Sequence, residues 1–170
     1  MRAVPLSAAH LEGVAALWRE AAVIRYTNVP GPCGPAESRR RLDQLLACQA
    51  GLPAPTIFAL EEGGRFCGIA GCPPVETGVF GLFYQLSPAC WGRGLGLRGA
   101  SLALEALERQ FPAPEVRAEV VAENAASVHI LERLGFWRTG VRPGAFCREG
   151  RLLDVWTYLR CTGGGKERPV

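Results

Sequence analysis

The stretch Trp91-Gly92-Arg93-Gly94-Leu95-Gly96 contains three alternating glycines and lies between a predicted strand, 77–86, and a predicted helix, 97–110. Glycine tolerates positive φ angles and lets a ligand approach the backbone closely. Such a turn can therefore direct several backbone N–H groups toward one point, and the start of the following helix adds its positive dipole end. Arg93 and Arg98 add positive charge nearby. This pattern indicates a site for a phosphate or a pyrophosphate.

The glycine-rich turn has three interpretations: a turn without a ligand, a dinucleotide-binding motif, or a coenzyme A site. The segment Gly94–Gly99 fits the pattern GxGxxG. However, a dinucleotide-binding domain presents that motif early and follows it with several strand–helix units, whereas about one such unit follows here. A P-loop is excluded because the chain contains no Gly-Lys-Ser/Thr sequence.

A second motif begins thirty residues after Gly94, beyond a predicted strand at 116–121. It runs from Asn124 to Phe136 and reads NAASVHILERLGF. Together the two motifs resemble the GNAT acetyltransferase superfamily, in particular its ribosomal-protein-alanine acetyltransferase-like branch. That branch shows Trp-Gly-x-Gly-x-Gly, and then Asn-x-x-Ser leading to Leu-Gly-Phe. The resemblance is strong over residues 77–160 and weak over the first 55.

The resemblance implies a single α/β domain with a mixed central sheet, splayed between its fourth and fifth strands and flanked by helices. Residue periodicity and turn signals agree with this order. Strands are predicted at 2–6, 56–60, 65–72, 77–86, 116–121, 136–141 and 152–159, and helices at 7–18, 35–50, 97–110 and 125–134. Residues 1–160 are predicted as the N-acetyltransferase domain. Residues 161–170, with three consecutive glycines, are predicted as a flexible C-terminal tail.

Composition argues against several other classes of protein. The net charge of the 170 residues is only +3, and the one basic cluster, Arg39-Arg40-Arg41, is predicted as the solvated face of a helix, so no nucleic acid partner is expected. No apolar run approaches the ~20 residues of a membrane span, so no membrane partner is expected. Seven cysteines without a CxxC pair and two histidines indicate reduced thiols and no metal site. We therefore expect a cytoplasmic monomer or homodimer.

In the superfamily that this sequence resembles, the pantetheine arm of acetyl-CoA lies between the fourth and fifth strands. The resemblance implies that the backbones of Gln85 and Leu86 pair with this arm, and that the pyrophosphate is held by the amides of Trp91, Gly92, Arg93, Gly94, Leu95 and Gly96. Asn124 would hydrogen-bond the arm near the thioester. Alternatively, Asn124 acts only as a helix N-cap. Ser127 is either a cofactor contact or an ordinary residue of the first helical turn.

The sequence departs from the catalytic pair that the family often uses. That pair is a glutamate in strand four as base and a helix tyrosine as acid, and the matching positions here are Gly81 and Leu131. Substitutes are Ser127, Glu119 and Tyr84, and further candidates are Glu76, Glu123 and His129. Tyr84 can also be a core aromatic residue, and Glu119 a solvated charge. Without a base, an already neutral amine can still react because it is held close to the thioester.

The sequence thus predicts transfer of an acetyl group from acetyl-CoA to a primary amine by direct attack in a ternary complex. The branch resemblance favours a protein N-terminal α-amine as acceptor, with a polyamine or an amino sugar as alternatives. The loop Asn28–Pro35 and the turn Pro73-Pro74 are expected to carry acceptor selectivity. Two other functions stay open. One is a coenzyme A-binding or sensing module with little or no transfer activity, and the other is a nicotinamide-dependent oxidoreductase, which rests on GxGxxG alone.

Overall fold

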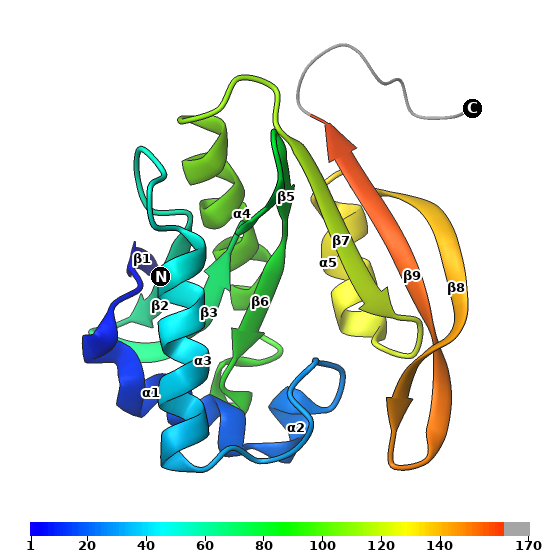
Figure 1. The fold of residues 1–170 in the computed structure, drawn as a ribbon, viewed down its shortest axis with the longest axis horizontal. Helices are drawn as coiled ribbons and strands as arrows, with labels where there is room; N and C mark the ends of the chain where they lie inside the picture. Colours follow the sequence, from blue (N-terminus) through cyan, green and yellow to red (C-terminus); the bar gives the residue numbers. More distant parts are fainter. Residues whose placement is uncertain (162–170) are drawn as a thin grey trace.

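The computed structural model describes residues 1–161. The last strand ends at Cys161, and the rest of the predicted tail, 162–170, lies outside the described residues. The strands form two sheets, which meet where residues 79–86 pass from one to the other (Figure 1).

The first sheet is antiparallel and has the strand order β1-β2-β3-β6. Its strands are β1 (Arg2–Pro5), β2 (Ile57–Glu62), β3 (Arg65–Gly71) and β6 (Phe83–Leu86). The second sheet has the order β4-β5-β7-β9-β8. Its strands are β4 (Pro74–Glu76), β5 (Val79–Gly81), β7 (Glu115–Val121), β8 (Trp137–Arg148) and β9 (Arg151–Cys161). Since β5 and β7 run parallel and their neighbours antiparallel, this sheet is mixed.

Helices cover both faces of the first sheet (Figure 1). The helices are α1 (Leu11–Arg19), α2 (Ala21–Ile24), α3 (Pro35–Cys48), α4 (Leu95–Glu108) and α5 (Ala125–Arg133), with short 3-10 helices at Ala8–His10 and Pro88–Cys90. Helices α1 and α3 lie on one face of the first sheet, and α4 lies on the other. The helix α5 packs against β7 of the second sheet.

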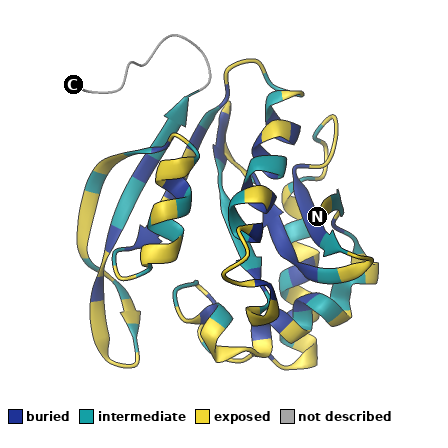
Figure 2. Ribbon diagram, turned by 180° about the vertical axis from the view of Figure 1, so that it is seen from behind, coloured by how far each residue is buried: buried dark blue, intermediate teal, exposed yellow. Residues whose placement is uncertain are grey.

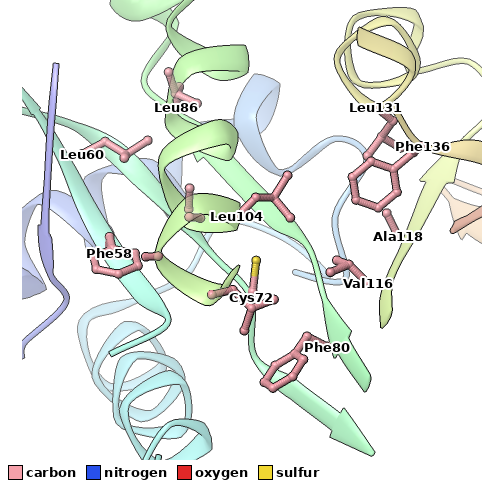
Figure 3. Packing of buried hydrophobic residues seen from close by; sticks show 14 of the residues in the cluster. Phe58, Leu60, Cys72, Phe80, Leu86, Leu104, Val116, Ala118, Leu131 and Phe136 are labelled. Carbon is pink, nitrogen blue, oxygen red and sulfur yellow. The ribbon is translucent and has the colours of Figure 1, made fainter. Parts of the chain in front are cut away.

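Alternate residues of β2 account for the two helical layers, because successive side chains of a strand point to opposite faces. Ile57 and Ala59 belong to one buried cluster with residues of α1 and α3, whereas Phe58 and Leu60 belong to another with Leu104 of α4. Figure 3 shows Phe58 and Leu60 on the side that faces Leu104. Burial is concentrated along these central strands, while turns and the end of the β8–β9 hairpin are exposed (Figure 2).

The predicted fourth strand, 77–86, is divided at Leu82. Up to Gly81 it pairs with β7, and the N–H of Leu82 donates to the carbonyl of Arg117 at 2.9 Å. The next four residues, 83–86, pair with β3 instead, while 118–121 of β7 pair only with β9 among the described strands. The two strands therefore diverge beyond Leu82 and Arg117, which confirms the predicted splay. We call the divergence between 83–86 and 118–121 the strand gap.

Several predicted boundaries were wrong. The separate strand β4, which begins at Pro74, was not predicted, and its proline is tolerated because β4 is an edge strand. Strand β8 was expected to end near residue 141, but it continues to Arg148 past Pro143, because irregular pairing with β9 accommodates the proline. Helix α4 starts at Leu95 rather than at residue 97, and the short α2 was not predicted.

Candidate active site

The glycine-rich turn has an open outer side. Gly92 and Gly94 have φ angles of +70° and +71°, which favour glycine, and a Cβ added at either would meet no atom within 4 Å. Gly94 is the N-cap of the 14-residue helix α4, and Leu95 is buried beneath it. The free N–H groups of the first helical turn and the positive end of the helix dipole are therefore combined with open space, an arrangement that suits an anion.

Three side chains around this turn have different surroundings. The guanidinium of Arg93 pairs with the Glu62 carboxylate at 2.5 Å, which offsets part of its charge. Arg98 is exposed and forms no ion pair within residues 1–161. The indole N–H of Trp91 donates to the carbonyl of Leu86 at 2.9 Å, and this bond ties the turn to the end of β6. Arg98 is thus the cation near the turn that is free to meet an anion.

Backbone groups of β6 point into the strand gap. The N–H of Ser87 donates to the Cys67 carbonyl at 2.8 Å, so these residues form a hydrogen-bonded antiparallel pair. Such pairs alternate along two strands, and Gln85 therefore directs its backbone toward Ile69 of β3. Tyr84 and Leu86 direct theirs the other way, although the Leu86 carbonyl is occupied by the indole N–H of Trp91. Their direction matches that of Leu82, which still reaches β7.

The same alternation applies to β7. The N–H of Ala122 donates to the Asp154 carbonyl at 2.9 Å, so the even-numbered residues of β7 bond to β9. Glu119 and Val121 therefore direct their backbones toward the strand gap, where the Val121 carbonyl already accepts a hydrogen bond from the N–H of Asn124 at 2.8 Å. Unpaired backbone groups inside a protein are unfavourable, so both sides of the gap favour an extended ligand that carries amide groups.

Gln85, which was expected to contact the cofactor, is engaged elsewhere. Its backbone faces β3, and its side-chain carbonyl accepts a hydrogen bond from the Trp18 indole N–H at 2.8 Å. Leu86, the other residue of that expectation, does face the gap. The sequence did not single out the backbone of Tyr84, whose role depends on the register between β3 and β6.

Three expected residues lie together across the strand gap. The side chain of Asn124 caps α5 by accepting a hydrogen bond from the N–H of Ser127 at 3.3 Å. The hydroxyl of Tyr84 donates to the carbonyl of the same Ser127 at 3.2 Å. Tyr84 therefore connects β6 to the first turn of α5. Burial raises the pKa of Tyr84 to about 12, so its hydroxyl stays protonated at neutral pH.

The structure does not bring the candidate carboxylates to this group. Glu119 pairs with Arg142 at 2.7 Å, and both side chains are more than half exposed. Glu76 pairs with Arg117 at 3.1 Å. Glu123 is exposed and pairs with an arginine of the β8–β9 hairpin. The remaining candidate, His129, is exposed on α5.

The two positions that match the family's catalytic pair carry no proton-transfer group. Gly81 has no side chain, and a Cβ there would make ordinary contact with Val75 at 3.5 Å. Leu131 is 2% exposed and belongs to the same core cluster as Ala118 and Phe136 (Figure 3). Any proton transfer at this site therefore depends on other groups or on water.

A pocket of about 590 Å³, which no sequence pattern predicted, lies beside the end of β7. Its wall on one side is formed by α2 and the residues after it, including Ile24, Arg25 and Tyr26. Its other wall is formed by Glu123 and by the end of the β8–β9 hairpin. Pro30, Gly31 and Pro32 of the expected selectivity loop also line it.

Three further observations concern the described residues. Within 1–161, no group of three or more His, Cys, Asp or Glu side chains is arranged to hold a metal ion. All seven cysteines are free thiols. None of the helices in this part of the chain is long and apolar enough to cross a membrane.

Comparisons with known proteins give a family and a set of similar folds. A family model described as an acetyltransferase (GNAT) domain matches residues 2–137. The structure of yncA from Salmonella typhimurium, which contains its cofactor acetyl-CoA, is similar with a TM-score of 0.82 and 21% identity, over 99% of this chain and 98% of that chain.

Two other solved structures have the same fold. Ribosomal-protein-alanine N-acetyltransferase from Brucella melitensis has a TM-score of 0.78 and 20% identity, over 95% of this chain and 99% of that chain. A phosphinothricin acetyltransferase from Sinorhizobium meliloti, solved with acetyl-CoA, has a TM-score of 0.77 and 21% identity, over 100% of this chain and 94% of that chain.

Proposed function

This chain belongs to the GNAT acetyltransferase family, and from this premise we propose that it transfers the acetyl group of acetyl-CoA directly to a primary amine in a ternary complex. The observation that carries the proposal is the combination of two features. The strand gap offers unpaired backbone groups from β6 and β7, and the glycine-rich turn offers free N–H groups at the start of α4. Acetyl-CoA has a matching amide-bearing arm and a pyrophosphate.

The geometry favours a particular placement of acetyl-CoA. The backbone of Tyr84 and the N–H of Leu86 pair with the pantetheine arm, in place of the expected backbones of Gln85 and Leu86. The amides of the turn 91–96 bind the pyrophosphate, and Arg98 supplies the free positive charge. The side chain of Asn124 keeps its cap and also contacts the arm near the thioester.

The chemistry follows from what surrounds the thioester. The amine nitrogen attacks the carbonyl carbon, the C–S bond then breaks, the thiolate of coenzyme A leaves, and the nitrogen loses a proton. With no carboxylate at Gly81 and exposed ion pairs at Glu76 and Glu119, we assign this proton to water. The rate then comes chiefly from holding a neutral amine against the thioester.

Tyr84 acts here as a hydrogen-bond donor and not as the acid. Its pKa of about 12 lies above the value of ~8.5 that is typical of a thiol, so proton transfer from the phenol to the departing thiolate is unfavourable. Instead, its bond to the Ser127 carbonyl holds α5 in position. Ser127 itself has a hydroxyl at the start of α5 that can donate to the thiolate.

We place the amine acceptor in the pocket of about 590 Å³ between α2 and the β8–β9 hairpin. Glu123 lines this pocket and directly precedes Asn124, so the pocket lies close to the proposed thioester position. A protein N-terminal α-amine remains our preferred acceptor. The seven free thiols suit a reducing compartment, and so we expect the protein in the cytoplasm as a monomer or homodimer.

The test is to mix the protein with acetyl-CoA and a panel of amines and to follow the release of free thiol. The panel contains a tripeptide with a free N-terminal alanine, spermidine, glucosamine and phosphinothricin, the last because one structural neighbour is a phosphinothricin acetyltransferase. We expect thiol release that depends on the protein and on at least one amine.

Two other results would point elsewhere. Tight binding of acetyl-CoA without thiol release in the presence of any amine would support a coenzyme A-sensing module. The lack of a proton-transfer side chain at Gly81 and Leu131 favours this alternative. Binding of NAD but not of coenzyme A would overturn both functions.

A further inference from the structure

The β8–β9 hairpin ends in a tight turn that carries two arginines. Arg148 and Arg151 lie directly opposite each other, with Glu149 and Gly150 between them. Both central residues have positive φ angles, 53° and 76°, as in the turns that best fit the twist of a two-residue hairpin. Opposed residues of an antiparallel pair project from the same face, so the turn presents both guanidinium groups together.

The guanidinium of Arg148 bonds to four carbonyls of one short segment, 24–30. One terminal nitrogen donates to Pro30 at 2.9 Å. The other shares its two N–H groups among the carbonyls of Ile24 at 3.1 Å, Thr27 at 2.8 Å and Val29 at 2.8 Å. These residues precede Arg148 by 118 to 124 positions, so one side chain joins distant parts of the chain.

Segment 24–30 has little regular structure to hold this arrangement. Helix α2 comprises only four residues and ends at Ile24, and the turn after it is closed by bonds of Thr27 to the Ile24 carbonyl. Four carbonyl oxygens that converge on one point repel one another unless a donor satisfies them. A guanidinium supplies several fixed N–H groups and a delocalised charge, whereas a lysine ammonium supplies three N–H groups from one nitrogen.

The other arginine of the turn contacts the opposite side of the pocket. Arg151 pairs with Glu123, which follows β7, at 2.8 Å. The hairpin end thus contacts both α2 with its following segment and the β7–α5 connection. The pocket of about 590 Å³ is lined by these same parts.

We propose that Arg148 is a positioning residue that assembles the acceptor pocket by fixing segment 24–30 against the hairpin. The proposal rests on the proposed function, because it assigns the pocket to the amine. Arg148 contacts neither the strand gap nor the glycine-rich turn through any of its four bonds, so its effect falls on the amine and not on acetyl-CoA.

The variant Arg148→Lys tests this, with Arg138→Lys as the matched control. Arg138 lies on the same strand, is exposed, and has its guanidinium carbon 4.6 Å from the ring centre of Trp156, a cation–π contact of a kind that a lysine also makes. Three quantities are measured: the KM for the amine of the above panel that the unmodified protein acetylates fastest, the affinity for acetyl-CoA by calorimetry, and amide hydrogen exchange in 24–31. For Arg148→Lys we expect the amine KM to rise about tenfold or more and exchange in 24–31 to quicken, with acetyl-CoA affinity changed less than about twofold.

Other outcomes overturn the proposal. These are an unchanged amine KM in Arg148→Lys, unchanged exchange in 24–31, or a loss of acetyl-CoA affinity as large as the rise in KM. If no amine of the panel is acetylated, the pocket assignment fails together with the proposed function. The exchange experiment still shows separately whether Arg148 fixes the segment.

Discussion

At the scale of single residues, Gly94 combines a positive φ angle with open space on its outer side. In our account this is where the cofactor pyrophosphate approaches the backbone. Asparagine and aspartate tolerate the left-handed conformation better than other side chains, and they have nearly the same shape. They therefore separate the effect of charge from the effect of backbone strain.

We expect Gly94→Asp to weaken acetyl-CoA binding at least about tenfold relative to Gly94→Asn, because a carboxylate beside the pyrophosphate repels it. The measurement is calorimetric titration of both variants, with thermal unfolding to confirm that their stabilities agree. Equal affinities in the two variants would mean that the pyrophosphate binds elsewhere.

Tyr84 gives a second prediction at this scale, through its raised pKa. Below pH 10 the hydroxyl is protonated in both the folded and the unfolded chain, and its bond to Ser127 contributes about 1 kcal/mol. Between pH 10 and about 12 the unfolded chain loses this proton first, so the contribution is lost as pH rises. We expect the stability advantage of the unmodified protein over Tyr84→Phe to be present at pH 8 and to shrink at pH 11.

Urea unfolding at the two pH values measures this advantage, and the comparison cancels the other titrating groups. An advantage that grows with pH would contradict the burial of Tyr84. A further check is the pH dependence of acetyl transfer between pH 6 and 9, which should keep its shape in Tyr84→Phe. If the rate of Tyr84→Phe no longer rises or falls with pH where that of the unmodified protein does, Tyr84 acts as an acid or a base.

At the scale of elements, the strand gap depends on how closely β6 lies against β3. A Cβ at Gly68 would lie 2.1 Å from the Gln85 carbonyl oxygen and 2.8 Å from Cα of Leu86. Because both are backbone atoms, β6 would have to move away from β3 and toward the gap. Gly81, on the neighbouring strand, has room for a Cβ at 3.5 Å from its nearest atom.

We expect Gly68→Ala to destabilise the fold by about 1–3 kcal/mol and to weaken acetyl-CoA binding, whereas Gly81→Ala changes stability by less than about 0.5 kcal/mol. Thermal unfolding would show a midpoint lower by about 2–4 °C per kcal/mol for a chain of this size. If Gly68→Ala unfolds at the same temperature as Gly81→Ala, the position of β6 is not set by this contact.

Much of the element order could be predicted from the sequence because its signals are local. Three alternating glycines before a helical pattern located the turn and α4, and Asn124 three residues before Ser127 located the start of α5. A continuous apolar run located β2, and alternating apolar and charged residues located β7. Each of these signals lies within a few residues of the feature that it predicts.

The rest depended on pairing between distant segments. The division of 77–86 at Leu82 is decided by which neighbour each half pairs with, and both halves have strand-like residues. For the same reason the sequence could not show that Gln85 faces β3 while Tyr84 faces the gap. The four carbonyls around Arg148 come from residues with no side-chain signature, so the pocket was visible only in the structure.

At the scale of the whole molecule, the two sheets are joined at one end and diverge at the other (Figure 1). The chain itself joins them where it passes from β5 to β6, and two side chains connect the diverging parts farther along. Tyr84 connects β6 to α5, and Arg148 connects the hairpin end to segment 24–30. In our account acetyl-CoA occupies the strand gap, and the amine enters from the pocket between α2 and the β8–β9 hairpin.

This arrangement makes one direct claim, that acetyl-CoA lies in the strand gap and on the glycine-rich turn. Amide hydrogen exchange with and without saturating acetyl-CoA, read by mass spectrometry, tests it. We expect slower exchange in peptides that cover 83–98 and 119–127, and unchanged exchange in 35–48 of α3, which lies on the far side of the first sheet. Binding that leaves 83–98 and 119–127 unchanged, or no binding at millimolar acetyl-CoA, would contradict the account.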